Sequence, residues 1–343
     1  MFCRFLMRLA LILPVAFLFT CCADDLQNGN IFESGDQDAT ISFSVEKVLL
    51  TRGDSSFEWE SAIESAYLLF YDKNDVSGSG LPIAAVRAEV KEESPERLSF
   101  KMPLRLEENK DYRLLAVANA DRYVPDGFSG FDAYIDAWCN SDRDSEDDPF
   151  YLYHSDILTS KVGALPMVGY PVGGGSFRFT RENGVCRVNT SLSFRRKVAR
   201  IDVVNVVKEG FVVEGVALCN WRDAVAVEDD NLSSGSIHSS ISGFSKFPDA
   251  DETGIQKLLG ELYCFPSSTV ASEANDQTST ALILKARYGE DADPSYYRIN
   301  VGLDGNRAEV KSNTRYSVTV TSVKARGANS PEEAYASEDS NLV

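Results

Sequence analysis

Histidine and basic residues are scarce in this sequence, and each shortage narrows the range of functions. Only two histidines, His154 and His238, occur among 343 residues, so chemistry that uses several imidazoles has few ligands available. Acidic residues outnumber basic ones by 52 to 34, which gives a formal net charge of −18. Such a surface repels phosphate backbones, and nucleic-acid binding is therefore disfavoured.

Familiar catalytic and metal-binding motifs are also absent. The sequence contains no G-x-S-x-G, no H-E-x-x-H and no C-x-x-C motif. The acidic run Asp142–Asp148 lacks the turn glycine and the closing glutamate of an EF-hand, so we interpret it as a solvated loop rather than a calcium site. We expect no cofactor, no metal and no catalytic residues.

A long apolar run occurs at the N-terminus. Two arginines precede the run Leu9–Phe19, which is too short to span a bilayer stably and is typical of a signal peptide. The following Thr20-Cys21-Cys22 resembles a bacterial lipobox. We prefer Cys22 as the acylated residue, because Thr20 and Cys21 then supply short side chains before it; Cys21 is the alternative. Residues 1–21 are therefore predicted to be a lipoprotein signal peptide.

The acidic residues after the lipobox bear on location. Asp24 and Asp25 resemble the acidic export signals of lipoproteins that reach the outer face of the outer membrane in some Gram-negative bacteria. Two or three acyl chains on Cys22 would hold the protein firmly on that membrane. The alternative is a plain secretory signal with incidental cysteines.

The stretch from Asp38 to Arg52 has the pattern of a strand that can be removed. Ile41, Phe43 and Val45 alternate with polar residues, as in a half-buried strand, and Arg52 opens an exposed turn. A sheet that loses a strand gains an open edge, which a strand from another chain can fill. We interpret residues 22–52 as a tether and removable first strand, and the protein as a fibre subunit assembled by strand exchange.

Short strands at roughly regular spacing follow, separated by turn residues, and this rhythm predicts β-sandwich architecture. We expect an N-terminal domain over residues 53–184, with a short helix near Phe131–Trp138, and a C-terminal domain over residues 185–343. The expected strands are Ser65–Tyr71, Pro82–Val90, Arg97–Met102, Asp111–Asp121, Gly210–Trp221, Leu262–Pro266, Ala281–Tyr288, Ser295–Val301 and Tyr316–Lys324.

A basic segment crosses the predicted domain boundary. The β-rich run Arg187–Val207 carries Arg195, Arg196, Lys197 and Arg200 in an otherwise acidic protein. Either these cations guard a strand edge, or they hold the two domains together or meet an acidic surface of a neighbouring subunit.

The mature cysteines leave two possibilities open. Cys139, Cys186, Cys219 and Cys264 could form two disulfides in an exported protein. Because Cys186 and Cys219 lie inside apolar strand patterns, we favour free buried thiols.

The order of four features resembles the type V fimbrillins, the major, accessory and anchor pilus subunits of a group of anaerobic Gram-negative bacteria. These features are the lipoprotein leader; Asp38–Phe43 with Arg52 at a cleavage-like position; the strands Tyr67–Tyr71 and Ala116–Ala120; and Leu165–Gly169 leading into Phe194–Val203.

The resemblance implies an all-β protein with two tandem transthyretin-like β-sandwich domains. It also implies export as an acylated precursor, followed by cleavage after an arginine by an arginine-specific protease. Arg52 matches that arginine. A donor strand from another fimbrial subunit would then fill the vacated groove, and the assembled fimbria would support adhesion at the cell surface.

The C-terminus departs from the pattern of stalk-forming members. The residues after Lys324 are acidic, contain Pro331 and have weak strand character. The chain could therefore be a stalk subunit whose donor includes Tyr316–Lys324, or a tip or anchor subunit. An anchor would keep its lipid and its first strand, with Arg52 uncut.

Two other classes of function remain as alternatives. A surface lipoprotein that binds glycans or proteins without polymerising would use exposed aromatic side chains, for which the candidates are Trp59, Trp138, Trp221, Tyr296 and Tyr297. Packing of these residues in a core is the simpler interpretation. A secreted hydrolase would need paired carboxylates in a cleft, and the acidic residues here show no recognisable spacing.

Overall fold

The computed structural model describes residues 36–46, 57–73, 80–90, 97–140, 150–154, 158–183, 185–228, 237–268, 279–304 and 307–337. These residues form an almost entirely β structure, with α-helices at Phe131–Asn140 (α1) and Pro331–Ala336 (α2). Within these ranges, no helix has the length and apolar character needed to cross a membrane. Residues 31–343 form one compact unit. The all-β sandwich class is confirmed, whereas the division into two tandem domains stays a prediction.

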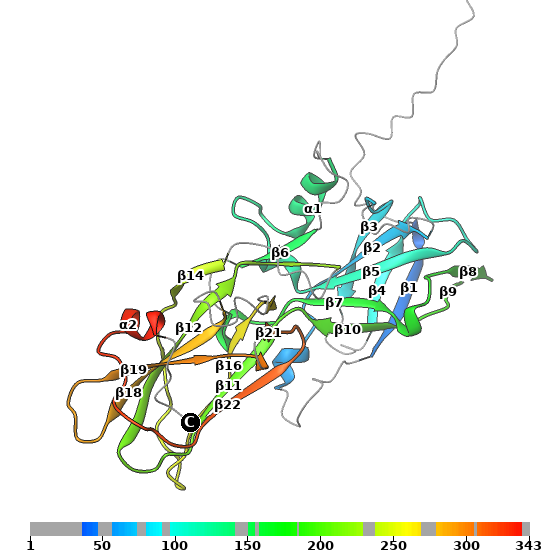
Figure 1. Ribbon diagram of the computed structural model, residues 1–343. Coiled ribbons are helices and arrows are strands. Elements are labelled where there is room, and N and C mark those ends of the chain that lie inside the picture. The colour runs from blue at the N-terminus through cyan, green and yellow to red at the C-terminus, as the bar shows by residue number, and fades with distance from the viewer. Residues whose placement is uncertain are drawn as a thin grey trace, which may run out of the picture. The chain divides into compact units, whose positions relative to one another are not determined.

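Seven strands close on themselves into a barrel in the N-terminal part (Figure 1). Their order around the barrel is β1-β10-β7-β5-β2-β3-β4. The strands are β1 Asp36–Glu46, β2 Ala66–Asp72, β3 Ala84–Val90, β4 Arg97–Met102, β5 Tyr112–Ala118, β7 Met167–Pro171 and β10 Leu192–Arg196. The barrel is a sandwich joined at two corners, because β3 pairs with both β2 and β4, and β1 pairs with both β4 and β10.

Aromatic and aliphatic side chains fill the barrel. Phe70 of β2 contacts Phe100 of β4 and Phe177, with ring centroids 6.0 and 5.1 Å apart. Leu98, Leu114 and most of their neighbours in this core are almost fully buried. Burial of each such side chain contributes about 1.5–3 kcal/mol, so this core is a main source of the stability of the barrel.

A second sandwich follows in the C-terminal part, formed by two sheets. One sheet has the order β16-β11-β22 and the other has the order β14-β12-β18-β19, with β15 added to β12. The strands are β11 Ala199–Asn205, β12 Phe211–Arg222, β14 Ile237–Ile241, β15 Ser245–Lys246, β16 Gln256–Cys264, β18 Ala281–Tyr288, β19 Ser295–Asn300 and β22 Arg315–Val320. Side chains of both sheets share one core, which includes Ile201, Leu218, Leu262 and Leu284.

The remaining strands are short. They are β6 Tyr151–Tyr153 with β13 Ala224–Ala226, the hairpin β8 Phe179–Glu182 with β9 Val185–Val188, and the group β17 Ser267–Ser268, β20 Leu303–Asp304 and β21 Arg307–Val310. Single 3-10 turns are η1 Glu58–Ser61, η2 Ala120–Arg122, η3 Ser160–Val162 and η4 Val172–Gly174. The hairpin β8–β9 spans the predicted boundary between residues 184 and 185, and β10 pairs with β7 of the barrel.

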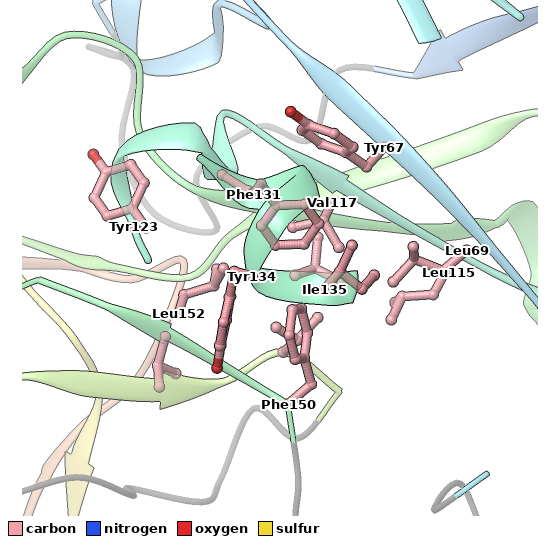
Figure 2. Packing of buried hydrophobic residues seen from close by; sticks show 14 of the residues in the cluster. Tyr67, Leu69, Leu115, Val117, Tyr123, Phe131, Tyr134, Ile135, Phe150 and Leu152 are labelled. Atoms are coloured by element: carbon pink, nitrogen blue, oxygen red, sulfur yellow. The ribbon is translucent and has the colours of Figure 1, made fainter. Parts of the chain in front are cut away.

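The predicted short helix is confirmed as α1, and its aromatic side chains explain why it is there. Figure 2 shows Phe131, Tyr134 and Ile135 of α1 packed among residues of the barrel strands and Phe150. The rings of Tyr134 and Phe150 stack with centroids 4.8 Å apart. The helix therefore covers the outer face of β2 and β5, which would otherwise expose apolar side chains such as Leu69 and Leu115.

Free thiols are confirmed at the four described cysteines. Cys219 and Cys264 are buried, and this burial raises the pKa of Cys219 to about 11 and that of Cys264 to about 12. Cys139 and Cys186 are only half-buried. The expectation that Cys186 is fully buried is wrong, because Cys186 packs against the barrel core from outside and is only partly buried.

Gly169, the last residue of the motif Leu165–Gly169, leaves room for a buried aromatic ring. Gly169 of β7 pairs with Phe194 of β10, and a Cβ atom at Gly169 would lie 2.9 Å from the Phe194 ring. Phe194 is 3% exposed and belongs to the barrel core. The ring can occupy this place only because its partner has no side chain.

We expect Gly169→Ala to destabilise the protein by about 1–3 kcal/mol, because the added methyl group overpacks the core. Urea denaturation measures this change. Phe194→Leu should partly rescue Gly169→Ala, so the double variant should lose less stability than the sum of the single variants. Additive losses would show that Gly169 and Phe194 are not in the contact described.

Candidate functional site

The predicted removable strand is β1, which closes the barrel between β4 and β10. It runs antiparallel to β4, where Ile41 pairs with Phe100 and Phe43 pairs with Leu98. Both partners in β4 are buried. At its end, β1 runs parallel to β10 and Val45 pairs with Leu192. The strand begins at Asp36, two positions before the predicted start at Asp38, and it stays a prediction that it can be removed.

Both neighbours of β1 need it for their backbone hydrogen bonds. In β4, the residues from Arg97 to Lys101 each pair with a residue of β1. Within the described part of the chain, the other side of β4 pairs with β3 only through Leu98 and Ser99. Without β1, the barrel would therefore have two open edges, at β4 and at β10, and unpaired edges of this kind recruit other strands.

Three predicted sites lie outside the described residues. These are the lipidation site at Cys22, the cleavage site at Arg52 and the acidic run Asp142–Asp148. The described chain resumes after Arg52 at Phe57, in the turn that leads into η1.

The carboxylate of Glu60 in η1 is fully buried and lies among hydrogen-bond donors. The Arg200 guanidinium donates to Glu60 Oε1 at 3.1 Å, and the Tyr263 hydroxyl donates to the same oxygen at 2.5 Å. The backbone N–H of Phe57 donates to Glu60 Oε2 at 3.1 Å. The main chain of Glu60 is held as well, because Arg196 Nε donates to its carbonyl oxygen at 2.6 Å.

A second buried carboxylate continues the network. Asp202 of β11 accepts hydrogen bonds from Arg200 Nε at 2.8 Å, from the backbone of Gly260 at 2.9 Å and from Arg315 Nε at 2.5 Å. We call the six residues Glu60, Arg196, Arg200, Asp202, Tyr263 and Arg315 the Glu60 cluster. Its members come from η1 and from strands β10, β11, β16 and β22, so it joins the start of the barrel to the second sandwich.

Burial and charge act against each other in this cluster. Burial alone would lower the pKa of Arg200, but hydrogen bonds and charges from Asp202 and Glu60 outweigh it, so the pKa is raised. Burial raises the pKa of Tyr263, and its hydrogen bond to Glu60 raises that pKa further. Arg196 has its pKa lowered by burial. Because a buried charge without a partner is costly, the cluster is stable only when complete.

Gly260 lets the cluster fit against the aromatic ring of Phe57. The guanidinium carbon of Arg200 lies 4.8 Å from the centre of that ring. Gly260 of β16 has φ +68°, and a Cβ atom there would lie 2.1 Å from the same ring. A side chain at position 260 would therefore displace Phe57 from Arg200.

Asn119 holds the residues that follow Glu60 in the chain. Its side-chain oxygen accepts from the backbone N–H of Glu64 at 2.8 Å, and its nitrogen donates to Ala62 at 2.9 Å and to Leu165 at 2.7 Å. Asn119 adopts φ +59°, a left-handed conformation that asparagine tolerates better than most residues. The chain from residue 57 to residue 65 is thus fixed at both ends.

The basic segment is explained by these contacts. Arg196 and Arg200 are 4% and 2% exposed, and β11 is the middle strand of its sheet. Arg196 and Arg200 therefore join Glu60 to distant strands, and the hypothesis of a guarded strand edge is wrong for these two residues. That the cations hold two domains together stays a prediction. Sequence reasoning missed Glu60, Asp202 and Tyr263. An arginine and an aspartate two apart in a strand, as in Arg200-Ile-Asp202, were the available signal.

The candidate aromatic residues pack inside the protein. Trp221 and Tyr297 are buried, and Trp138 is half-buried against Phe150. Trp59 packs edge-on against Tyr263, with ring centroids 5.3 Å apart. Among the tryptophans and tyrosines named as candidates, none in the described ranges is exposed, which favours core packing over a glycan platform.

The C-terminal segment is part of the second sandwich. Tyr316 and Val318 lie in β22, which pairs in parallel with β11 from Arg315 to Val320. Beyond it, Ala328 exchanges two backbone hydrogen bonds of 2.9 Å with Tyr296 of β19. Ser330 then caps α2 by accepting from the backbone of Glu333. A donor strand that includes Tyr316–Lys324 would have to leave these pairings.

Comparisons with known proteins were made on sequence and on structure. No known family profile matches the chain, and no curated protein sequence matches it. Several solved structures do match the chain. The tip fimbrial protein Mfa3 of Porphyromonas gingivalis, solved with a C-terminal truncation, matches with a TM-score of 0.46 and 13% identity over 83% of this chain and 94% of its own.

Two further structures give the same kind of match. The fimbrilin FimA of Porphyromonas gingivalis has a TM-score of 0.44 and 14% identity, covering 87% of this chain and 93% of its own. A candidate cell adhesion protein of Bacteroides eggerthii has a TM-score of 0.49 and 13% identity, covering 89% and 93%. The chain is similar to fimbrial and adhesion proteins.

We expect Glu60→Gln to lower the free energy of unfolding by about 3 kcal/mol, because it leaves the buried guanidinium of Arg200 without one of its two carboxylates. Glu58→Gln is the matched control, since Glu58 is an exposed residue of the same turn and should change stability by less than about 0.5 kcal/mol. Urea denaturation of both variants decides the matter. If Glu60→Gln were as stable as Glu58→Gln, the role given to Glu60 would be contradicted.

Proposed function

We propose that this protein is a structural subunit of a surface fimbria that assembles by proteolysis-triggered strand exchange and supports adhesion. In this proposal the chain is acylated at Cys22 and reaches the outer membrane. An arginine-specific protease then cuts after Arg52, β1 leaves, and a strand of another fimbrial subunit takes its place. The observation that carries the proposal is the position of β1, which completes the barrel between β4 and β10.

The position of β1 at the start of the chain supports release by a single cut. Each of the other barrel strands lies between other strands of the fold along the chain, so a single cut would free none of them. A cut at Arg52 would separate β1 from Phe57 and from all residues that follow. The next described residues are held by the Glu60 cluster and by Asn119, so the cut would leave their contacts in place.

The pairing of β1 also defines what can replace it. An incoming strand must pair with β4, where Leu98 and Phe100 belong to the barrel core. Because side chains alternate along a strand, its apolar residues must recur at every second position, as Ile41, Phe43 and Val45 do. Backbone pairing would supply much of the affinity, and the alternating apolar residues would supply specificity.

Cleavage at Arg52 is tested on leaderless precursor with an arginine-specific protease, followed by N-terminal sequencing and sizing. We expect a new N-terminus at Gly53, loss of β1 and growth of ladders. Arg52→Ala should abolish all three. Arg187→Ala, which removes an exposed arginine of β9, should change none of them. A cut subunit that loses β1 and stays monomeric when mixed with uncut and cut subunits would refute strand exchange.

Peptide capture tests the groove itself. A synthetic peptide of residues 36–46 should rebind to the cut subunit. The same peptide with Ile41→Ser and Phe43→Ser should bind at least about tenfold more weakly, because it loses two apolar side chains of the alternating pattern. Equal binding of the two peptides would show that the groove is not the binding site.

A further inference from the structure

The strand β10 of the barrel continues almost directly into β11 of the second sandwich (Figure 1). Only Lys197 and Val198 separate them, and these are 0% and 1% exposed. The backbone N–H of Lys197 donates to Pro166 at 2.9 Å, and Val198 accepts from the backbone N–H of Asn313 at 2.9 Å. The connection is therefore a buried, hydrogen-bonded bend of two residues and not a long loop.

The strand β11, which follows this connection, is placed to resist pulling. β11 is the middle strand of its sheet, antiparallel to β16 and parallel to β22, and its residues from Arg200 to Asn205 pair with β22. Inter-strand hydrogen bonds lie across the strand direction. A force along β11 would therefore load many of these bonds at once instead of opening them one after another.

The Glu60 cluster ties η1 across the same connection. Arg196 at the end of β10 binds the carbonyl oxygen of Glu60, and its Nη2 atom donates to Ser61 at 3.0 Å. Arg200 at the start of β11 binds the carboxylate of Glu60, and Tyr263 of β16 binds it from the neighbouring strand. One turn is thus fastened to the last barrel strand and to two strands of the second sandwich.

We propose that the β10–β11 connection carries pulling force between the barrel and the second sandwich, and that the Glu60 cluster is a mechanical clamp that keeps them from separating under that force. This rests on the proposed function, since force in a fibre enters each subunit through the strand held between β4 and β10. The path is the same whether that strand is a donor or a retained, lipid-held β1.

The clamp is tested by pulling single leaderless molecules by tags at both ends. The first step is the loss of β1, after which the chain between Asp36 and Phe57 can extend to at most roughly 70 Å. Force then acts on η1 and its clamp. Tyr263→Phe removes one hydrogen bond to Glu60, and it should make the next step about tenfold faster at a given force.

Tyr112→Phe is the matched control. Tyr112 is also fully buried, and its hydroxyl accepts from the backbone of Glu107 at 2.7 Å, but it lies in the barrel away from the cluster. It should leave the rate of the clamp step unchanged. The proposal is overturned if Tyr263→Phe behaves as wild type, or if Tyr112→Phe accelerates the same step equally.

Fibre assembly separates this proposal from the proposed function. If Tyr263→Phe subunits form ladders as readily as wild type but show a faster clamp step, both proposals are supported. Wild-type subunits that form no ladders but show a clamp step sensitive to Tyr263→Phe would refute only strand exchange. Ladders together with an insensitive clamp step would refute only the clamp.

Discussion

A barrel strand must have a neighbour on each side, and this constraint gives β1 its importance. β4 and β10 do not meet in the closed barrel, and β1 supplies the backbone groups between them. β1 precedes every other strand of the barrel in the sequence, so the residues that follow it join it to those strands. In the proposed assembly, one cut after Arg52 would detach this strand. Other sheet proteins cover or charge such an edge. Here the edge is covered by a segment that precedes the rest of the fold.

The Glu60 cluster holds the chain that follows the predicted cleavage site in contact with both halves of the fold. It places five charged side chains and one phenol at the point where η1, β10, β11, β16 and β22 meet. Buried charges contribute little net stability compared with apolar packing, but they demand one geometry, because any missing partner leaves a charge unpaired. The same contacts fix the chain directly after the predicted cut and join the barrel to the second sandwich. One set of residues can thus limit the effect of cleavage and transmit force.

The sequence predicted the periodic features well. The predicted strands Arg97–Met102 and Ala281–Tyr288 have their observed ends, and the predicted short helix near Phe131–Trp138 is α1. The partner of a buried charge could not be predicted in this way. Arg200 stood out as a cation in an apolar strand, but Glu60 lies 140 residues away in an unremarkable turn, and no local pattern links the two. Likewise nothing in the motif Leu165–Gly169 indicated that Gly169 leaves room for the ring of Phe194.

Hydrogen exchange of β4 and β10 tests the central claim that a removable strand completes the barrel. Amide protection would be compared in the precursor, in the cut subunit freed of β1, and in the assembled fibre. The account predicts that protection of Arg97–Met102 and Leu192–Arg196 is lost when β1 leaves and returns on assembly, while the strands of the second sandwich stay protected throughout. Unchanged protection of β4 and β10 after loss of β1 would contradict it, because the barrel would then be complete without that strand.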